Sequence, residues 1–253
     1  MSTVVVSVLG ALVVGGLCLF GPQVIRRLPE PPAPDDEADT TLAGAGRSDS
    51  PMAHATDYVK VPYIELATRP NLAIKLGLVG LVVGAVIGAA LSDEPIVAAW
   101  LFLGVVGVWL GYVDAQTRLL PTRIIAPSYG VLVLLILLAA AIDGETGDLV
   151  RAVIGWAVYG GFYFLMWFIY PRGLGYGDVR LAGLLGLALG FLGWGQLLVG
   201  MYAGFLLGGV IGAVLALAKV VDRKRYPFGP FMLVGAIVGL VAGAPFADWY
   251  TGV

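Results

Sequence analysis

The sequence predicts an all-α protein that crosses a membrane several times, and three observations support this prediction. Of its 253 residues, 59% are hydrophobic and 13% are charged, whereas soluble domains average about 45–50% apolar and about 25% charged residues. The apolar residues gather in long runs with few or no charges, which is the pattern of membrane-spanning helices. The 37 glycines often recur at the three- and four-residue spacing that lets helix backbones approach closely in lipid.

Eight apolar segments approach the ~20 residues that a helix needs to cross the hydrocarbon core. We therefore expect about eight transmembrane helices, with the first and the sixth at the short end of the range. The segments cover residues 3–20, 72–91, 95–113, 123–142, 150–170, 178–193, 196–218 and 230–248.

The first apolar segment, Val4 to Phe20, is expected to be a retained membrane span with its N-terminus outside. A secretory signal begins with a basic region, but no Lys or Arg precedes this segment, and Arg26 and Arg27 follow it. The single cysteine, Cys18, lies inside it, so the chain offers neither a disulfide framework nor a cysteine zinc site.

Residues 30–71 differ from the rest and predict a largely disordered cytosolic linker. The stretch from Glu30 to Asp57 is rich in Pro, Asp, Ser and Ala and lacks an apolar period. It contains the single histidine, His54, to which we assign no role. Tyr58 to Ala67 regains apolar residues and is expected to lie on the membrane surface. The predicted units are thus an N-terminal helix with its flank (1–29), the linker (30–71) and a seven-helix membrane core (72–253).

The distribution of basic residues predicts the orientation of the spans. If the N-terminus lies outside and the spans alternate, 14 of the 15 Lys and Arg residues fall in or beside cytosolic loops, and only Arg151 falls outside. This is the bias that the positive-inside rule describes. An even number of spans also places the C-terminus outside. We expect a multi-pass protein of the inner or plasma membrane, with the lipid bilayer as a partner and no nucleic acid.

Two aspartates are predicted to share the cytosolic edge of the membrane. Asp114 ends the third apolar segment in GYVDAQTRLLPTRI, and Asp178 begins the sixth in RGLGYGDVRLAGLLG. An aspartate costs roughly 2.5–3.5 kcal/mol at the centre of a membrane helix and less near its edge. Two carboxyl groups brought close together share one proton, so the ionised group can accept a proton from water while the neutral group donates one to a scissile carbonyl. The pair therefore suits peptide hydrolysis without a metal, a cofactor or a covalent nucleophile.

Neighbouring residues fit such a site. Gly175 and Gly177 permit positive φ and leave room for a substrate backbone near Asp178. Pro121 suits a turn into the fourth span. A structural interpretation stays open for each aspartate: Asp178 as the N-cap of the sixth helix, and Asp114 as an ordinary carboxylate at a helix end.

Four stretches, taken in order along the chain, resemble the signatures of one family. They are VIRRLPEP, DAQTRLLPTRI, GLGYGDVRLAGLLG and RYPFGPFM, the last of which contains Pro227 and Gly229. They resemble the segment after the first span, the first aspartate motif, the GxGD motif and a third signature of the type IV prepilin peptidases, which are membrane aspartyl proteases. The resemblance implies that Asp114 and Asp178 are the catalytic pair. It also implies prepilin or pseudopilin precursors as substrates, cut on the cytosolic side between a short basic leader and a hydrophobic helix.

The sequence departs from the pattern of the two-function members of that family. Those members carry two zinc-binding CxxC pairs in the first cytosolic loop, whereas residues 21–71 contain no cysteine. We therefore expect an aspartyl endopeptidase that does not itself methylate the new N-terminus. The alternative is a non-catalytic scaffold or small transporter with a polar site. Because a transporter is expected to place a charge or a broken helix near mid-membrane, aspartates at span ends favour the protease.

Overall fold

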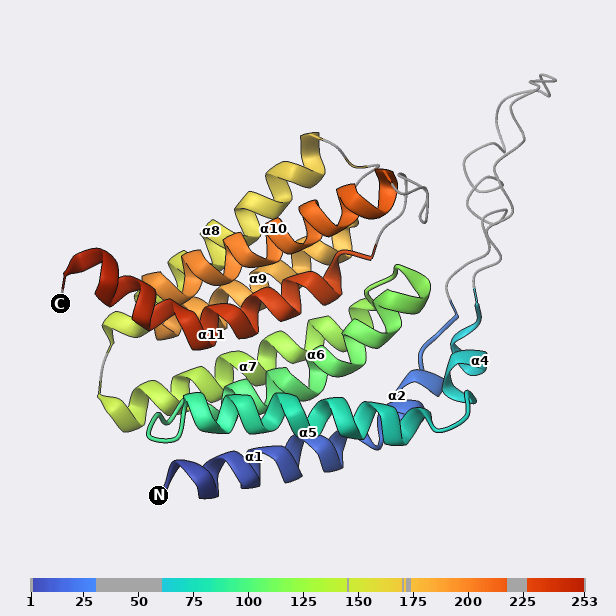
Figure 1. Ribbon diagram of the computed structural model, residues 1–253, viewed down its shortest axis with the longest axis horizontal. Coiled ribbons are helices and arrows are strands. Elements are labelled where there is room, and N and C mark those ends of the chain that lie inside the picture. The colour runs from blue at the N-terminus through green and yellow to red at the C-terminus, as the bar shows by residue number, and fades with distance from the viewer. Residues whose placement is uncertain are drawn as a thin grey trace.

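The computed structural model describes residues 2–30, 61–144, 146–169, 171, 174–217 and 227–252, without the side chains of 211–217. These residues form helices and no strands, so the all-α prediction is confirmed (Figure 1). Most of the predicted linker (30–71), namely residues 31–60 with His54, lies outside the described residues. The helices are α1 (Thr3–Cys18), α2 (Gly21–Arg26), α4 (Tyr63–Ala67), α5 (Leu72–Ala90), α6 (Val97–Thr117), α7 (Thr122–Asp143), α8 (Gly147–Ile169), α9 (Tyr176–Leu192), α10 (Trp194–Leu217) and α11 (Gly229–Thr251).

Six stretches of the described chain are long and apolar enough to cross a membrane, namely Thr3–Arg26, α5, α6, α7, α8 and α11. The protein is therefore a multi-pass membrane protein. Helix α9 has 17 residues, which gives a length of about 25 Å at 1.5 Å per residue, slightly less than the ~30 Å hydrocarbon core. Helix α10 contributes a shorter apolar stretch, Trp194–Val210. The count of eight spans stays a prediction.

Three antiparallel helix pairs build the bundle: α1 with α5, α8 with α9, and α10 with α11. Glycines bring the two backbones of each pair into contact. A Cβ added to Gly84 would lie 2.1 Å from the carbonyl oxygen of Gly10, which is far inside van der Waals contact. The close packing predicted from the repeated glycines is thus confirmed. Equivalent contacts join Gly186 to Gly155 and Gly235 to Gly204.

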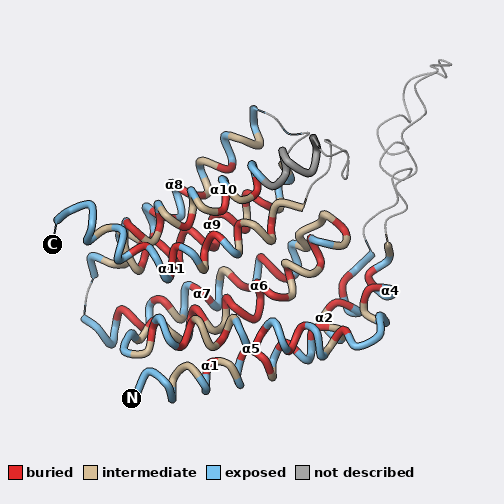
Figure 2. Tube along the Cα trace, in the orientation of Figure 1, coloured by how far each residue is buried: buried red, intermediate tan, exposed pale blue. Residues whose placement is uncertain are grey.

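Helix α9 is the most enclosed helix of the described bundle (Figure 2). Every residue from Val179 to Phe191 except Arg180 is buried. A helix that is apolar on all sides is stable only when neighbours surround it. Helices α7, α8, α10 and α11 all pack against it.

The carbonyl end of α9 is held by Arg151 of α8. Its Nε donates a 2.8 Å hydrogen bond to the carbonyl oxygen of Gly190, and its Nη2 donates to that of Phe191. The same guanidinium pairs with Asp148 at 2.9 Å. Arg151, the one basic residue predicted to lie outside, therefore binds the last carbonyl groups of α9, a position at which a cation is favoured.

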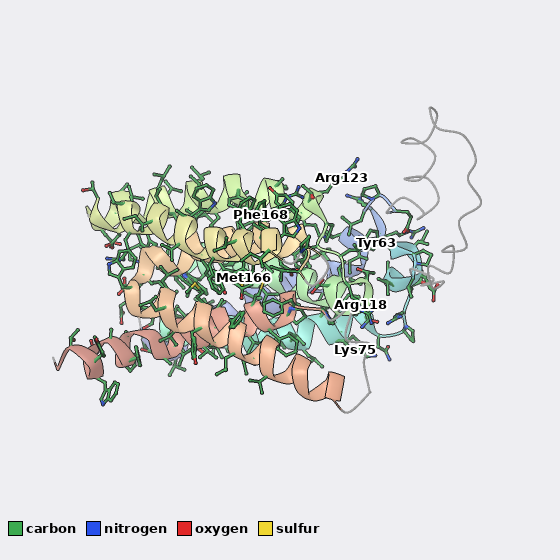
Figure 3. The ribbon with its side chains drawn as sticks, turned by 90° about the horizontal axis from the view of Figure 1, so that it is seen from above. Tyr63, Lys75, Arg118, Arg123, Met166 and Phe168 are labelled. Atoms are coloured by element: carbon green, nitrogen blue, oxygen red, sulfur yellow. The ribbon has the colours of Figure 1, made fainter. Side chains whose placement is uncertain are left out.

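The opposite end of the bundle gathers basic side chains. Lys75, Arg118 and Arg123 all lie there (Figure 3), whereas both chain termini lie at the other end (Figure 1). Arg180 also projects from α9 at the basic end, where it donates to the Oγ1 of Thr122 and stacks over a tyrosine ring. The predicted gathering of charge is present, while the compartment that this end faces stays a prediction.

Helix α4 packs at the basic end of the bundle, while its predicted place on the membrane surface stays a prediction. The carboxylate of Glu30 accepts hydrogen bonds from the backbone N–H groups of Tyr63 (2.9 Å) and Ile64 (3.2 Å). Tyr63 and Leu66 are buried, and α4 contacts α2. The segment therefore joins the first helical unit to the start of α5.

We predict that Gly84→Ala weakens the α1–α5 pair. The new methyl group has no space beside Gly10, and overpacking of this kind costs about 1–3 kcal/mol. Thermal unfolding of the detergent-purified protein should show a lower midpoint. Gly130→Ala is the matched control, because a Cβ at Gly130 meets nothing within 4 Å; it should leave the midpoint unchanged or raise it. An unchanged midpoint for Gly84→Ala would contradict the packing.

Candidate active site

Asp114 lies in the last turn of α6, and its side chain is 3% exposed. The helix ends at Arg118, which adopts the left-handed conformation with φ of 57° and donates its N–H to the carbonyl oxygen of Asp114 at 2.7 Å. The guanidinium of Arg118 also lies within electrostatic reach of the Asp114 carboxyl group. The abrupt helix end therefore places the carboxyl group at the basic end of the bundle.

The first residue of α11 fixes the Asp114 side chain. The buried N–H of Gly229 donates a 2.9 Å hydrogen bond to Oδ2 of Asp114. A Cβ on Gly229 would lie 2.8 Å from the same oxygen, so a side chain there would displace the carboxyl group. The PFGP stretch and the first aspartate, which are 115 residues apart, thus form one unit.

Asp178 lies in the first turn of α9 and is 8% exposed. Its Oδ2 accepts a hydrogen bond from the N–H of Gly175, and its own N–H donates to the carbonyl oxygen of Gly175, both at 3.0 Å. Gly175 is the N-cap of α9, so the interpretation of Asp178 as the N-cap is wrong; Asp178 lies three residues further on, and its carboxylate accepts a hydrogen bond from the backbone of the N-cap. Its other oxygen, Oδ1, is buried and has no hydrogen-bond partner in the described part of the chain, and capping does not account for it.

The two carboxyl groups lie within electrostatic reach of one another. They are the two buried carboxylates of the described residues, where the buried polar side chains are those of Asp114, Thr117, Ser128 and Asp178. Sequence analysis predicted that the aspartates would share an edge, and the structure brings them to one site. In each case a glycine amide holds one carboxyl oxygen.

The two glycines before Asp178 have a different role from the expected one. Gly175 has φ of −78° and ψ of 147°, Gly177 is helical, and the glycines with positive φ lie elsewhere. The expectation of positive φ was therefore wrong. What both positions need is space: a Cβ on Gly177 would lie 2.7 Å from the Cβ of Leu120, and one on Gly175 would lie 3.3 Å from Oδ2 of Asp178.

The two prolines predicted beside the site lie at helix starts. Pro121 is the N-cap of α7, with ψ of 120°, so the predicted turn into this span is confirmed. Pro227 lies two residues before α11, and Phe228 is the N-cap of that helix. Prolines suit such positions because they lack an N–H to pair.

Sequence analysis did not identify Tyr163 and Phe228 as part of the site. Tyr163 of α8 is 1% exposed, its ring centroid is 5.7 Å from that of Phe228, and its hydroxyl lies within electrostatic reach of Asp178. That hydroxyl makes no hydrogen bond of ordinary geometry to a described residue, and the same is true of Tyr159, whose ring is 5.3 Å away. The sequence could have pointed to these tyrosines, because two tyrosines four residues apart lie on one helix face, which is unusual inside an apolar span.

The described residues contain no group of three or more His, Cys, Asp or Glu side chains that could hold a metal ion. The chemistry that the site itself offers is proton transfer between two enclosed carboxyl groups, next to a tyrosine hydroxyl. General acid–base hydrolysis needs these groups.

Comparison with known proteins gives a consistent result. Residues 100–217 match the type IV leader peptidase family. The chain is 30% identical over 156 residues to a prepilin leader peptidase/N-methyltransferase of Aeromonas salmonicida, covering 60% of this chain and 52% of that protein. It is 32% identical over 199 residues to a protein of the same name from Burkholderia pseudomallei, covering 74% of this chain and 56% of that protein. The chain thus spans about half the length of these relatives, and no solved structure matches it.

The matched residues run from α6 to α10 and contain both members of the buried aspartate pair. The motifs, their geometry and the similarity to the relatives all agree with the match of residues 100–217 to the type IV leader peptidase family.

Proposed function

We propose that the protein is a membrane aspartyl endopeptidase that removes the short basic leader of type IV prepilin-like precursors at the cytosolic membrane face. The observation that supports it most is the pair itself. Asp114 and Asp178 are buried within electrostatic reach, and a glycine amide anchors one oxygen of each. The similarity to prepilin leader peptidases supports the choice of substrate.

In the proposed reaction, the aspartates divide the two proton transfers. The ionised carboxylate removes a proton from a water molecule, which attacks the scissile carbonyl carbon, and the neutral carboxyl group donates its proton to the carbonyl oxygen. Transfer of a proton to the leaving nitrogen then breaks the C–N bond. The unpaired Oδ1 of Asp178 is the oxygen that we assign to contact with water or substrate.

The cytosolic placement is supported by charge. The aspartates lie at the end where Lys75, Arg118 and Arg123 gather, and basic residues mark the cytosolic side of membrane proteins.

We limit the proposal to leader cleavage. The relatives are also named N-methyltransferases, but the segment in which two-function members carry cysteines, residues 21–71, has none. Mass spectrometry of a product made with this enzyme as the sole candidate should show a free N-terminus. A methyl mass increment with S-adenosylmethionine supplied would contradict this limit.

We predict that Asp114→Asn or Asp178→Asn alone abolishes cleavage and leaves the protein in the membrane. The amide keeps the size of the side chain and cannot exchange the catalytic proton. Because the two groups act as a unit, the double variant should be no worse than either single one. Leader loss on a gel is the measurement. Asp143→Asn, at an exposed carboxylate of the opposite end, should keep full activity. Normal cleavage by Asp178→Asn would disprove the pair.

We also predict that Tyr163→Phe slows cleavage by on the order of 10²-fold, the usual effect of losing one donor to a developing charge, without lowering stability. Burying an unpaired hydroxyl costs free energy, so its removal should leave the melting temperature unchanged or raise it. Tyr159→Phe is the control, because its hydroxyl is similarly buried and interacts with Tyr163 rather than directly with Asp178. Equal rates for Tyr163→Phe and the parent would exclude the tyrosine from the chemistry.

The proposed orientation can be tested by labelling. A cysteine introduced at Asp143 should react with a membrane-impermeant maleimide in intact cells, and one at Arg123 only after permeabilisation. Cys18 is buried and should give little background. The reverse pattern would place the aspartates on the outer face.

A further inference from the structure

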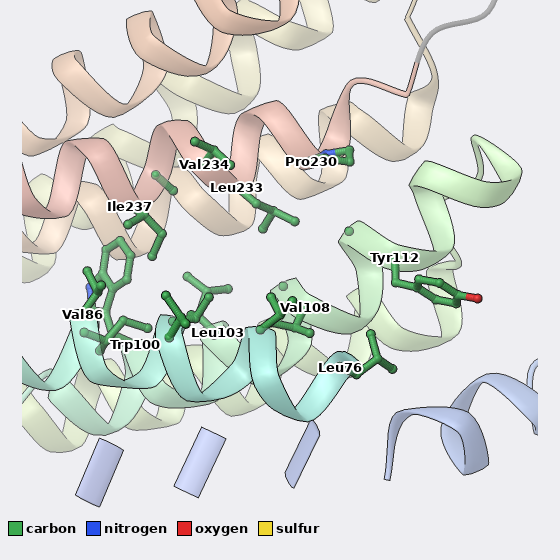
Figure 4. A pocket seen from close by; sticks show the side chains of 18 of the residues that line it. Leu76, Val86, Trp100, Leu103, Val108, Tyr112, Pro230, Leu233, Val234 and Ile237 are labelled. Atoms are coloured by element: carbon green, nitrogen blue, oxygen red, sulfur yellow. The ribbon is translucent and has the colours of Figure 1, made fainter. Parts of the chain in front are cut away.

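A long apolar groove runs between α5 and α11, with α6 as its floor (Figure 4). Its volume is about 490 Å³. Apart from Lys75, Trp100 and Tyr112, it is lined by aliphatic residues, glycine and proline. The lining includes Leu76 and Val86 of α5, Leu103 and Val108 of α6, and Leu233 and Ile237 of α11.

The groove opens to the surroundings of the bundle. Val79, Val82 and Val234 line it, and they are 51%, 65% and 52% exposed. A molecule within the bilayer could therefore enter sideways between α5 and α11, without passing through the protein or through water.

One end of the groove lies next to the start of α11, which holds Asp114, although neither aspartate lines the groove. Pro230 lines it and directly follows Gly229, whose N–H binds Asp114. Tyr112 also lines it, two residues before Asp114 on the same helix. A chain lying in the groove would thus emerge beside the carboxyl groups.

The length of the groove suits a helix. Its lining on α5 extends from Leu72 to Ile87, a rise of about 22 Å at 1.5 Å per residue. A peptide segment in an apolar environment must satisfy its own backbone hydrogen bonds, and a helix does so within one segment. Gly104, Gly107 and Gly111 on the floor carry no side chains of their own, and the atoms nearest to them are ends of flexible aliphatic side chains.

We infer that this groove binds the apolar helix that adjoins the scissile bond of the precursor. The inference rests on the proposed function, since it assigns the membrane-embedded part of the same substrate. The groove holds the helix, and the aspartate pair receives the extended chain at its end. A lipid acyl chain would also suit an apolar lining, but it has no reason to end at two carboxyl groups.

Filling the groove should reduce cleavage of one substrate and not of another. Val234→Trp places a bulky side chain in the groove, and Val241→Trp is its matched control, on the same helix, 51% exposed and outside the lining. For a precursor with its apolar helix, Val234→Trp should raise KM on the order of tenfold, the effect of about 1.4 kcal/mol of overpacking. For a short peptide with only the leader and the scissile bond, both variants should match the parent. Equal effects of Val234→Trp on both substrates, or none on the precursor, would overturn the inference.

A binding measurement separates this inference from the proposed function. The photoreactive residue benzoylphenylalanine is placed at Val234 or Val241 in the Asp178→Asn variant, in lipid vesicles with the precursor. Cross-links to the apolar helix from position 234 and not from 241 support the groove, even if the parent enzyme cleaves nothing and the proposed function fails. Lipid adducts alone from position 234, with a parent enzyme that cleaves, would overturn the groove and leave the function standing.

Discussion

A buried carboxyl group must have hydrogen-bond donors, and this requirement shapes the site more than any other. The first turn of a helix leaves backbone N–H groups without partners, and the protein uses the starts of two helices to supply them. The N–H of Gly175, just before α9, holds Asp178, and the N–H of Gly229, at the start of α11, holds Asp114. The active site can therefore exist only at an end of the bundle, where helices begin.

The glycine contacts between helices then determine what surrounds the pair. Because Gly155 and Gly186 bring α8 and α9 into backbone contact, Tyr163 comes within reach of Asp178. Because Gly204 and Gly235 do the same for α10 and α11, the start of α11 is held firmly against the bundle. Close packing thus serves the geometry of the site as well as the stability of the fold.

The local features of this arrangement were predictable from sequence, and the long-range ones were not. Hydrophobic runs predicted the helices within a few residues: the predicted span 72–91 is α5, Leu72–Ala90. The placement of Asp114 and Asp178 at span ends predicted their common edge.

The long-range contacts could not be predicted in this way. The hydrogen bond from Gly229 to Asp114 joins residues 115 positions apart, and the periodicity of a sequence carries no information about such a contact. The contact of Tyr163 with Phe228 was missed for the same reason. The φ values expected for Gly175 and Gly177 were wrong because glycine also occurs where space alone is limiting, and a single sequence does not separate the two causes.

Helix α9 is fastened at both ends. The hydrogen bonds of Asp178 and Gly175 close its start, and Arg151 with Asp148 closes its finish. These bonds at both ends keep α9 from sliding along its axis and from unwinding at either end. The carboxyl group of Asp178 therefore lies on a helix that is fixed in position. Because α9 is held in this way, the depth at which Asp178 meets a chain in the bilayer stays constant from one turnover to the next.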